Sequence, residues 1–148
     1  MRKDFGKEAA VFPLPVFIIA TYDENGRADA MNAAWGGKCG KTRIALNIGA
    51  GHMTTENIRR KKAFTVSFAT KDTVVISDYF GVESGKIADK IAKSGVHVRK
   101  SAFVDAPVIE EYPVTLECAA VELQELEGEV RVVGEIVGNA FSDGKALK

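Results

Sequence analysis

The segment between residues 31 and 39 combines residue types that suit the binding of a flat ligand. Met31-Asn32-Ala33-Ala34-Trp35 is followed by Gly36-Gly37, so most of its backbone carries small side chains or none. Such a strand leaves N–H and C=O groups open to a planar polar molecule, although small residues also mark a β-bulge or tight packing between sheets. Lys38 and Cys39 end the segment with a cation and a candidate redox-active thiol.

A second segment predicts an anion site at the start of a helix. Gly49-Ala50-Gly51-His52-Met53 reads as a flexible loop after a short strand, and Thr54 is placed to cap the helix that follows. Unpaired N–H groups and the helix dipole attract phosphate at such a terminus, where Thr54, Thr55 and Asn57 add uncharged donors. An ordinary capped helix explains the same residues. The loop lacks the Gly-Lys-Ser/Thr of a Walker A motif and the third glycine of a Rossmann fingerprint.

The composition is that of one globular domain spanning residues 1–148. Apolar residues make up 46% and charged residues 27%, and 20 basic residues balance 20 acidic ones. Because there is no basic stripe, apolar span or signal peptide, we expect neither nucleic acid nor membrane as a partner. Cys39 and Cys118 lie far apart without metal-ligand spacing, which predicts no metal site and a reducing, cytoplasmic location. Cys118, inside an apolar strand, is expected to be a buried small hydrophobe.

The order of apolar runs and turns predicts mainly antiparallel strands with short helices. Asn25-Gly26 marks a turn in the first hairpin, and Glu127-Gly128 marks a turn in the last one. Strands are expected at 16–21, 28–33, 43–48, 63–69, 114–124 and 130–137, and helices at 54–61, 72–80 and 84–93. This order has no βαβ rhythm and favours a closed or partly closed barrel, in which Gly134 and Gly138 ease the bending of the last strand.

Short motifs in a shared order along nearly the whole chain resemble those of the flavin reductase-like family, and within it the flavoredoxin-type proteins. Each motif is weak alone, and their common order makes the resemblance specific. The fold that it implies is the FMN-binding split β-barrel, mainly β and antiparallel in a Greek-key-like arrangement. The motifs include Phe12-Pro13-Leu14-Pro15-Val16, Met31-Asn32-Ala33-Ala34-Trp35-Gly36, Thr54-Thr55-Glu56-Asn57-Ile58, Asp78-Tyr79-Phe80-Gly81, Ser84-Gly85 with Asp89-Lys90, and Val133-Gly134-Glu135-Ile136.

The resemblance implies a homodimer that binds one FMN per subunit near the dimer interface. It places the Met31–Trp35 backbone against the flavin ring, and the start of the 54–61 helix at the ribityl hydroxyls and the phosphate. It also places Lys90 near the flavin, where an ammonium stabilises the negative charge of the reduced ring; an exposed position on a helix face is the alternative. His52 is either a ligand contact or a solvated loop residue. The cofactor-binding candidates are Met31, Asn32, Ala33, Ala34, Trp35, Lys38, His52, Thr54, Thr55, Asn57 and Lys90.

The activity that the resemblance implies is that of an FMN-binding oxidoreductase. NAD(P)H would reduce the flavin, and the reduced flavin would pass electrons to an acceptor. Hydride transfer needs no general acid or base, and Cys39 and Lys90 are the candidates for a catalytic role. Two alternatives stay open: a flavoredoxin-type electron carrier reduced by a redox partner protein, and a split-barrel module that binds flavin or haem without turnover. Family members usually continue beyond the point where this sequence stops, with a part that ordinarily adds a strand or arm near the flavin or the partner subunit.

Overall fold

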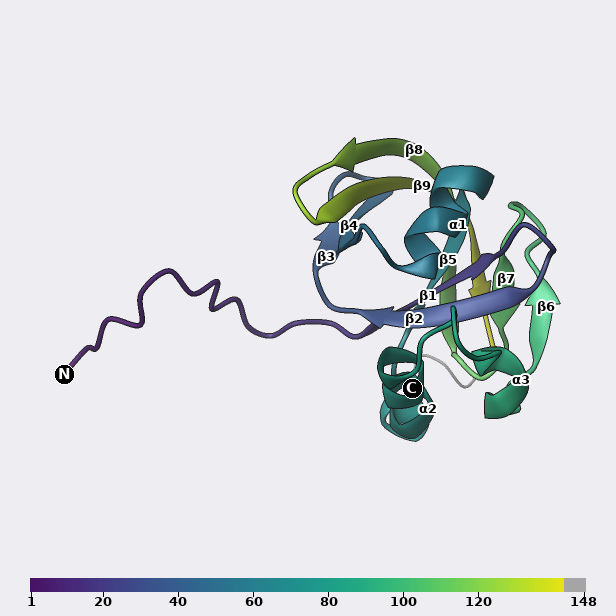
Figure 1. The fold of residues 1–148 in the computed structure, drawn as a ribbon, viewed down its shortest axis with the longest axis horizontal. Coiled ribbons are helices and arrows are strands. Elements are labelled where there is room, and N and C mark those ends of the chain that lie inside the picture. The colour runs from purple at the N-terminus through teal and green to yellow at the C-terminus, as the bar shows by residue number, and fades with distance from the viewer. Residues whose placement is uncertain (143–148) are drawn as a thin grey trace.

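The computed structural model describes residues 1–142, which form a strongly curved sheet, a small hairpin and short helices (Figure 1). The strands are β1 (Phe17–Tyr22), β2 (Ala28–Ala33), β3 (Gly36–Lys38), β4 (Arg43–Gly49), β5 (Ala63–Phe68), β6 (Val98–Lys100), β7 (Pro107–Ile109), β8 (Val114–Glu125) and β9 (Glu129–Phe141). The helices are α1 (Met53–Lys61), α2 (Val74–Val82), which follows a 3-10 turn at Lys71–Thr73, and α3 (Lys90–Ser94).

The main sheet is a split barrel. Its strand order is β2-β1-β5-β8-β9-β4-β3, and each neighbouring pair is antiparallel, whereas β6 and β7 pair separately. The two edge strands, β2 and β3, are joined through Ala34 and Trp35, and the backbone N–H of Asn47 donates to the Trp35 carbonyl at 2.8 Å. The expected mainly β barrel is confirmed, and α1 lies between its two halves (Figure 1).

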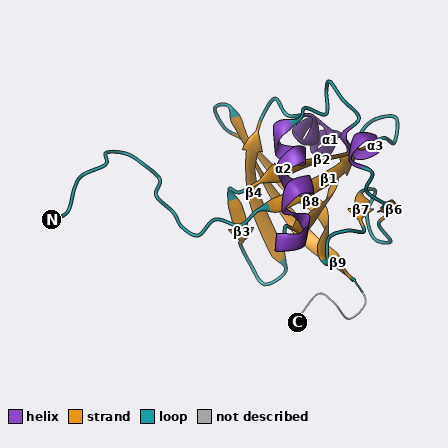
Figure 2. Cartoon of the chain, turned by 90° about the horizontal axis from the view of Figure 1, so that it is seen from below, coloured by secondary structure: helices purple, strands orange, loops and turns teal. Residues whose placement is uncertain are grey.

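Strand β1 is buried on both faces. Phe17 and Ile19 face the barrel interior with Leu46, Phe64 and other apolar residues of β4, β5, β8 and β9. The intervening residues of β1, Ile18 and Ala20, pack on the opposite face against a second cluster drawn from β2, α2 and the β7 region. Alternate residues of a strand point to opposite faces, so a continuous apolar run lets one strand serve two cores. Helices α2 and α3 therefore cover the outside of β1 and β2 (Figure 2).

Strands β8 and β9 bend where their pairing shifts register. Shifts occur between Glu117 and Cys118 and between Ala120 and Glu122. A bulge of this kind kinks and twists a strand, as barrel closure requires. Gly134 lies opposite Ala120 and has a second, steric reason to be glycine, since a Cβ there would stand 2.5 Å from the Phe64 ring.

Several sequence-based predictions of local structure are corrected. The helix expected at 84–93 is a turn followed by α3, which begins at Lys90 and is capped by Asp89, whose carboxylate accepts from the Ala92 amide. Helix α1 begins one residue before Thr54, and its N-cap residue is His52. The short strands β3, β6 and β7 were not predicted, because three-residue pairs carry too few residues to show alternation.

Three further features concern the N-terminal segment, the helices and a buried cysteine. Residues 1–16 contain no helix or strand and extend away from the barrel in both ribbon views (Figures 1 and 2). None of the helices in the described part of the chain is of the length and apolarity that crossing a bilayer demands. Cys118 is fully buried, as expected, and burial raises the pKa of its thiol to about 12.

The contact between Gly134 and Phe64 predicts the cost of one added methyl group. Gly134→Ala should lower the free energy of unfolding by about 1–3 kcal/mol, because the methyl group overpacks the barrel core. Urea denaturation measures the change. Gly37→Ala is the matched control, since a Cβ there has nothing within 4 Å, and it should change the stability by less than about 1 kcal/mol. Equal stability of the two variants would contradict the packing described for Gly134.

Candidate functional site

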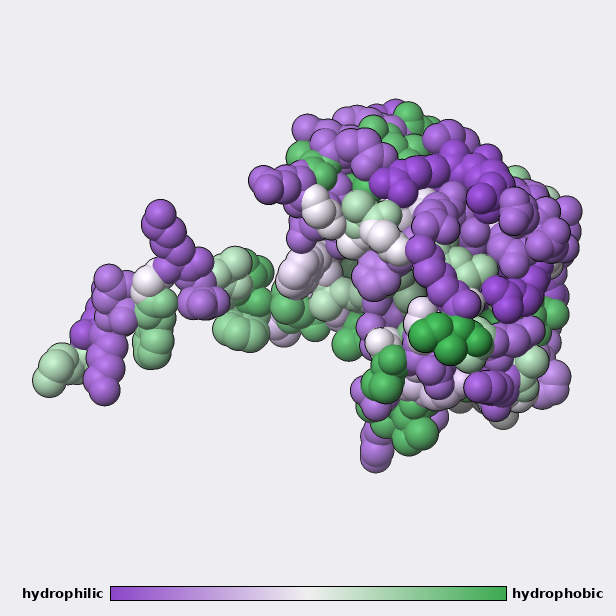
Figure 3. Space-filling model, viewed as in Figure 1, coloured by the Kyte–Doolittle hydropathy of each residue, from purple (hydrophilic) through white to green (hydrophobic). Residues whose placement is uncertain are grey.

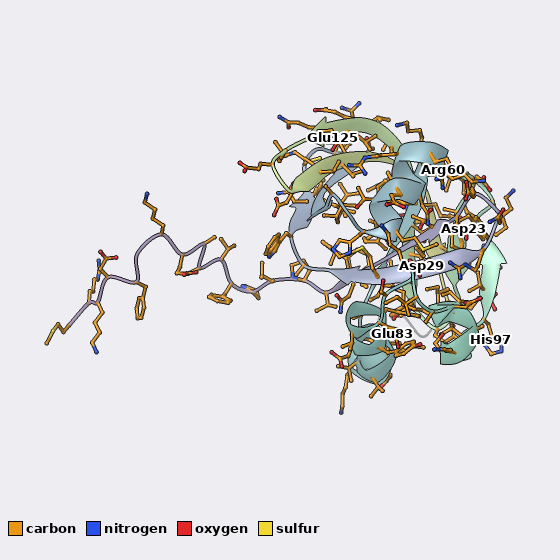
Figure 4. The ribbon with its side chains drawn as sticks, in the orientation of Figure 1. Asp23, Asp29, Arg60, Glu83, His97 and Glu125 are labelled. Carbon is orange, nitrogen blue, oxygen red and sulfur yellow. The ribbon has the colours of Figure 1, made fainter. Side chains whose placement is uncertain are left out.

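A cavity of about 430 Å³ opens between β2, the N-terminus of α1 and the segment that joins α2 to α3. Its volume lies within the range of roughly 300–1,000 Å³ typical of small-molecule sites. Figure 4 labels Asp29 on β2 and Glu83 just after α2, which come from two sides of this cavity. The lining consists of Asp29, Met31, Asn32, Gly51, His52, Met53, Thr54, Phe80, Gly81, Val82, Glu83, Ser84, Gly85, Lys86 and Lys90.

The first wall of the cavity is the N-terminus of α1. No side chain caps this terminus, where His52 is the N-cap residue in an extended conformation. Gly51, His52 and Thr54 line the cavity, and a Cβ at Gly51 would meet nothing within 4 Å. The first N–H groups of a helix have no intrahelical partners, so they and the helix dipole offer an anion site at this wall.

The second wall carries a buried ion pair. The Lys90 ammonium lies 3.7 Å from an Asp29 carboxylate oxygen, and both side chains are less than 5% exposed. Lys90 also donates to the Phe80 carbonyl at 3.2 Å. Burial lowers the pKa of Lys90 and raises that of Asp29, and in each case the charge of the partner opposes the effect. Among residues 1–142, Lys90 is the only lysine or arginine that is buried.

Two glycines allow the end of α2 and the segment that follows it to close onto β2. A Cβ at Gly85 would overlap the Asp29 carboxylate, and a Cβ at Gly81 would overlap the Asn32 amide. The Asn32 amide donates to the Ser77 carbonyl of α2 at 3.2 Å. Arg27 donates to the Gly85 carbonyl at 3.2 Å and pairs with Asp23 in the hairpin loop. These contacts hold residues 81–90 over β2 and give the cavity its depth.

The structure brings Met31, Asn32, His52, Thr54 and Lys90 together around this cavity. For Lys90, it excludes the alternative of an exposed position on a helix face, because the side chain is 3% exposed.

The side chains of Thr55 and Asn57 point into the protein instead. The Thr55 hydroxyl donates to the Gly49 carbonyl at 2.7 Å, and the Asn57 amide donates to the Thr21 hydroxyl at 3.0 Å in the core. These two side chains do not line the cavity, although they were expected to offer donors there. Their hydrogen bonds fasten the start of α1 to β4 and β1, so they position the helix terminus.

The remaining candidates lie elsewhere. Ala33, Ala34 and Trp35 do not line the cavity, and Trp35 is 59% exposed between the edge strands. Lys38 and the exposed Cys39 line a separate hollow of about 230 Å³ with Gly36, Gly37, Ala45, Asn47 and Arg131. His97 forms an exposed pair with Glu111 (2.8 Å) at the start of β6, apart from both hollows. Within residues 1–142, no group of three or more His, Cys, Asp and Glu residues is arranged to hold a metal ion.

Sequence reasoning missed Asp29, Lys86 and the packing role of Gly85. Asp29 could have been suspected because it is an acidic residue within a strand of small residues. A buried carboxylate in such a strand usually has a charged or hydrogen-bonding partner. The partner lies 61 residues along the chain, and the spacing of the sequence does not connect them. Lys86 pairs with Glu56 at the cavity, at 2.8 Å, with both side chains nearly half exposed.

The chain belongs to the family described as the flavin reductase like domain, whose model matches residues 9–147. This confirms the family resemblance and agrees with the split barrel. No curated protein gives a significant match in sequence.

Solved structures of two flavoredoxins are similar to the chain in both fold and sequence. Flavoredoxin of Desulfovibrio vulgaris (Miyazaki F) is 31% identical, with a TM-score of 0.90 over 97% of this chain and 78% of that one. Flavoredoxin of Methanosarcina acetivorans is 26% identical, with a TM-score of 0.87 over 97% of this chain and 76% of that one. An FMN-binding protein of Thermus thermophilus is 16% identical, with a TM-score of 0.82 over 97% and 79%, and shares the fold.

Proposed function

We propose that this chain binds FMN in the cavity between β2, α1 and the 81–90 segment and transfers electrons through it. One observation carries the proposal: the cavity brings an uncapped helix N-terminus and a buried ammonium, that of Lys90, to a single space. FMN carries a phosphate at one end and a polar ring at the other, so it suits a site with an anion-binding wall and a separate cation. Another hollow, of about 470 Å³, is lined by Val75, Ile76 and Tyr79 among others and contains none of the predicted site residues.

The donor set of the cavity fits this cofactor. The backbone at Gly51–Thr54 would receive the phosphate, with His52 and Lys86 nearby as further donors. Met31 and Asn32 would contact the ring, and Lys90 would act on its polar edge. Bound FMN would supply the two-electron chemistry, and the protein would position the ring and set the charge around it. Cys39 lies in the other hollow, so we assign it no part in this chemistry.

The donor and the acceptor separate two forms of this function. In the first, NAD(P)H reduces the bound FMN directly, as expected of a flavin reductase-like oxidoreductase. In the second, a redox partner protein reduces a tightly held FMN, and the chain is an electron carrier. The similarity to two proteins named flavoredoxins favours keeping the carrier as the second candidate.

We further propose that the functional unit is a homodimer. Large apolar side chains next to the cavity are strongly exposed in the single chain, among them Val82 at 80% and Ile87 at 85%. The extended N-terminal residues add Phe5 and Phe12, each at least 80% exposed, and Figure 3 shows apolar surface both along this segment and beside α2. Strongly exposed apolar side chains in such numbers mark an interface, and a second copy is the simplest symmetric partner.

A charge-placement experiment tests the proposed FMN site. Gly51→Asp should weaken FMN binding at least about tenfold, because a carboxylate beside a phosphate costs more than about 1.4 kcal/mol. The added side chain enters open space and precedes the N-cap of α1, so the fold should be unaffected. Gly37→Asp adds the same charge in open space at the other hollow and should bind FMN like the wild type. Titration by flavin fluorescence measures both. Loss of FMN binding in Gly37→Asp alone would place the FMN site at the other hollow. Absence of FMN binding by the wild type would reject the proposed function.

The same holoprotein distinguishes the two forms of the function. Under anaerobic conditions the flavin absorbance should bleach within seconds of adding NADH or NADPH if the chain is a reductase. Absorbance that persists until dithionite is added would reject direct turnover of NAD(P)H and establish the carrier.

The dimer is tested by light scattering after size exclusion. The wild type should have a mass about twice the 15.9 kDa of the chain, and Ile87→Lys should shift the mass towards that of one chain. Val121→Lys, at a 51% exposed position on β8, is the matched control and should leave the dimer intact. A wild-type mass of one chain would contradict the proposal.

A further inference from the structure

Contacts with the surrounding backbone hold both Asp29 and Lys90 in place, in addition to the attraction between their charges. The Asp29 carboxylate lies under the backbone of Gly85, where even a methyl group would not fit. The Lys90 ammonium is fixed from a second direction by the Phe80 carbonyl, at 3.2 Å. Lys90 is also the first residue of α3, whose start is fixed by the Asp89 cap. Both charges therefore have defined positions in the cavity wall.

Such a pair is costly to build and contributes little to stability by itself. Each charge loses its hydration on burial, which commonly offsets the attraction between the two. The directions of the two pKa shifts agree, since burial outweighs the partner's charge for both groups. Other charged groups near the pair are Arg27, which acts on Asp29, and Glu83, which acts on Lys90. A pair retained at such a cost beside a cavity is a candidate for a functional role.

The carboxylate attenuates the field of the ammonium in the cavity. A lone lysine would present a full positive charge to a ligand, and this would favour whichever form of the ligand is more negative. An opposite charge at 3.7 Å, in a wall that excludes water, cancels part of that field. Asp29 therefore reduces the effect that the Lys90 ammonium has on a ligand in the cavity.

We propose that Asp29 is a positioning and tuning residue that, through Lys90, sets the relative affinity of the cavity for oxidised and reduced flavin. This inference rests on the proposed FMN site. Reduced flavin carries more negative charge than oxidised flavin, so Lys90 favours the reduced form and Asp29 opposes that preference. The pair makes the bound flavin a stronger reductant than Lys90 alone would allow.

Four proteins form the test: the wild type, Asp29→Asn, Lys90→Met and the double variant. The readouts are the midpoint potential of bound FMN, from anaerobic titration against a reference dye, and the dissociation constant for oxidised FMN. In Asp29→Asn the ratio of the dissociation constants for oxidised and reduced FMN should rise by about tenfold, as one uncompensated charge at close range implies. In Lys90→Met the ratio should fall by a similar factor, and in the double variant it should lie near the wild-type value. A purely structural defect would not move the potential in opposite directions.

Glu56→Gln and Glu24→Gln are matched controls, because each removes a carboxylate charge from an ion pair whose side chains are about half exposed or more. Solvent screening predicts a change of less than about threefold in the ratio for each. Asp29→Ser removes the same charge as Asp29→Asn with a smaller side chain. If neither Asp29 variant folds, the double variant is compared with Lys90→Met at pH 8.5. The ratio of the dissociation constants for oxidised and reduced FMN should then be higher in the double variant.

Three outcomes would overturn the inference: an unchanged potential in Asp29→Asn, shifts of the same sign in both single variants, or equal shifts in the controls. Failure of the wild type to bind FMN would instead reject the proposed function on which the inference depends.

Discussion

The packing of residues 81–90 onto β2 is the contact on which the candidate site depends. It requires glycine at Gly81 and Gly85, because any side chain there would displace the Asn32 amide or the Asp29 carboxylate. It also buries Lys90, which would otherwise face water at the start of a short helix. The close approach of this backbone to two side chains of β2 thereby creates the depth of the cavity and the charge in its wall.

The barrel supplies the opposite wall by a different kind of interaction. Thr55 and Asn57 hydrogen-bond to Gly49 and Thr21, so the first turn of α1 is fastened to two strands of the main sheet. These polar side chains are consumed in holding the helix, and its backbone N–H groups remain free to face the cavity. Because the residues that place the helix terminus differ from those that line the site, the terminus is preorganised for an anion.

The sequence predicted the main strands, the barrel and the family, because these follow from patterns spread over many residues. Runs such as the one in β1 and the turn at Gly26 specify local structure directly. The site was predicted in part: the loop before α1 and the residues Met31, Asn32 and Lys90 line one cavity. The direction of the Thr55 and Asn57 side chains, and the pairing of Asp29 with Lys90, depend on tertiary contacts between distant segments. Local pattern carries no information on such contacts, and for the same reason the 84–93 segment was expected to be helical throughout.

The central claim, that the cavity between β2, α1 and the 81–90 segment is the flavin site, is tested most directly by hydrogen exchange. Amide exchange would be compared with and without saturating FMN. The account predicts slower exchange in residues 51–54 and 81–86, which line the cavity, and unchanged exchange in residues 36–39 at the other hollow. Protection confined to residues 36–39, or no protection in the 51–54 loop, would contradict it.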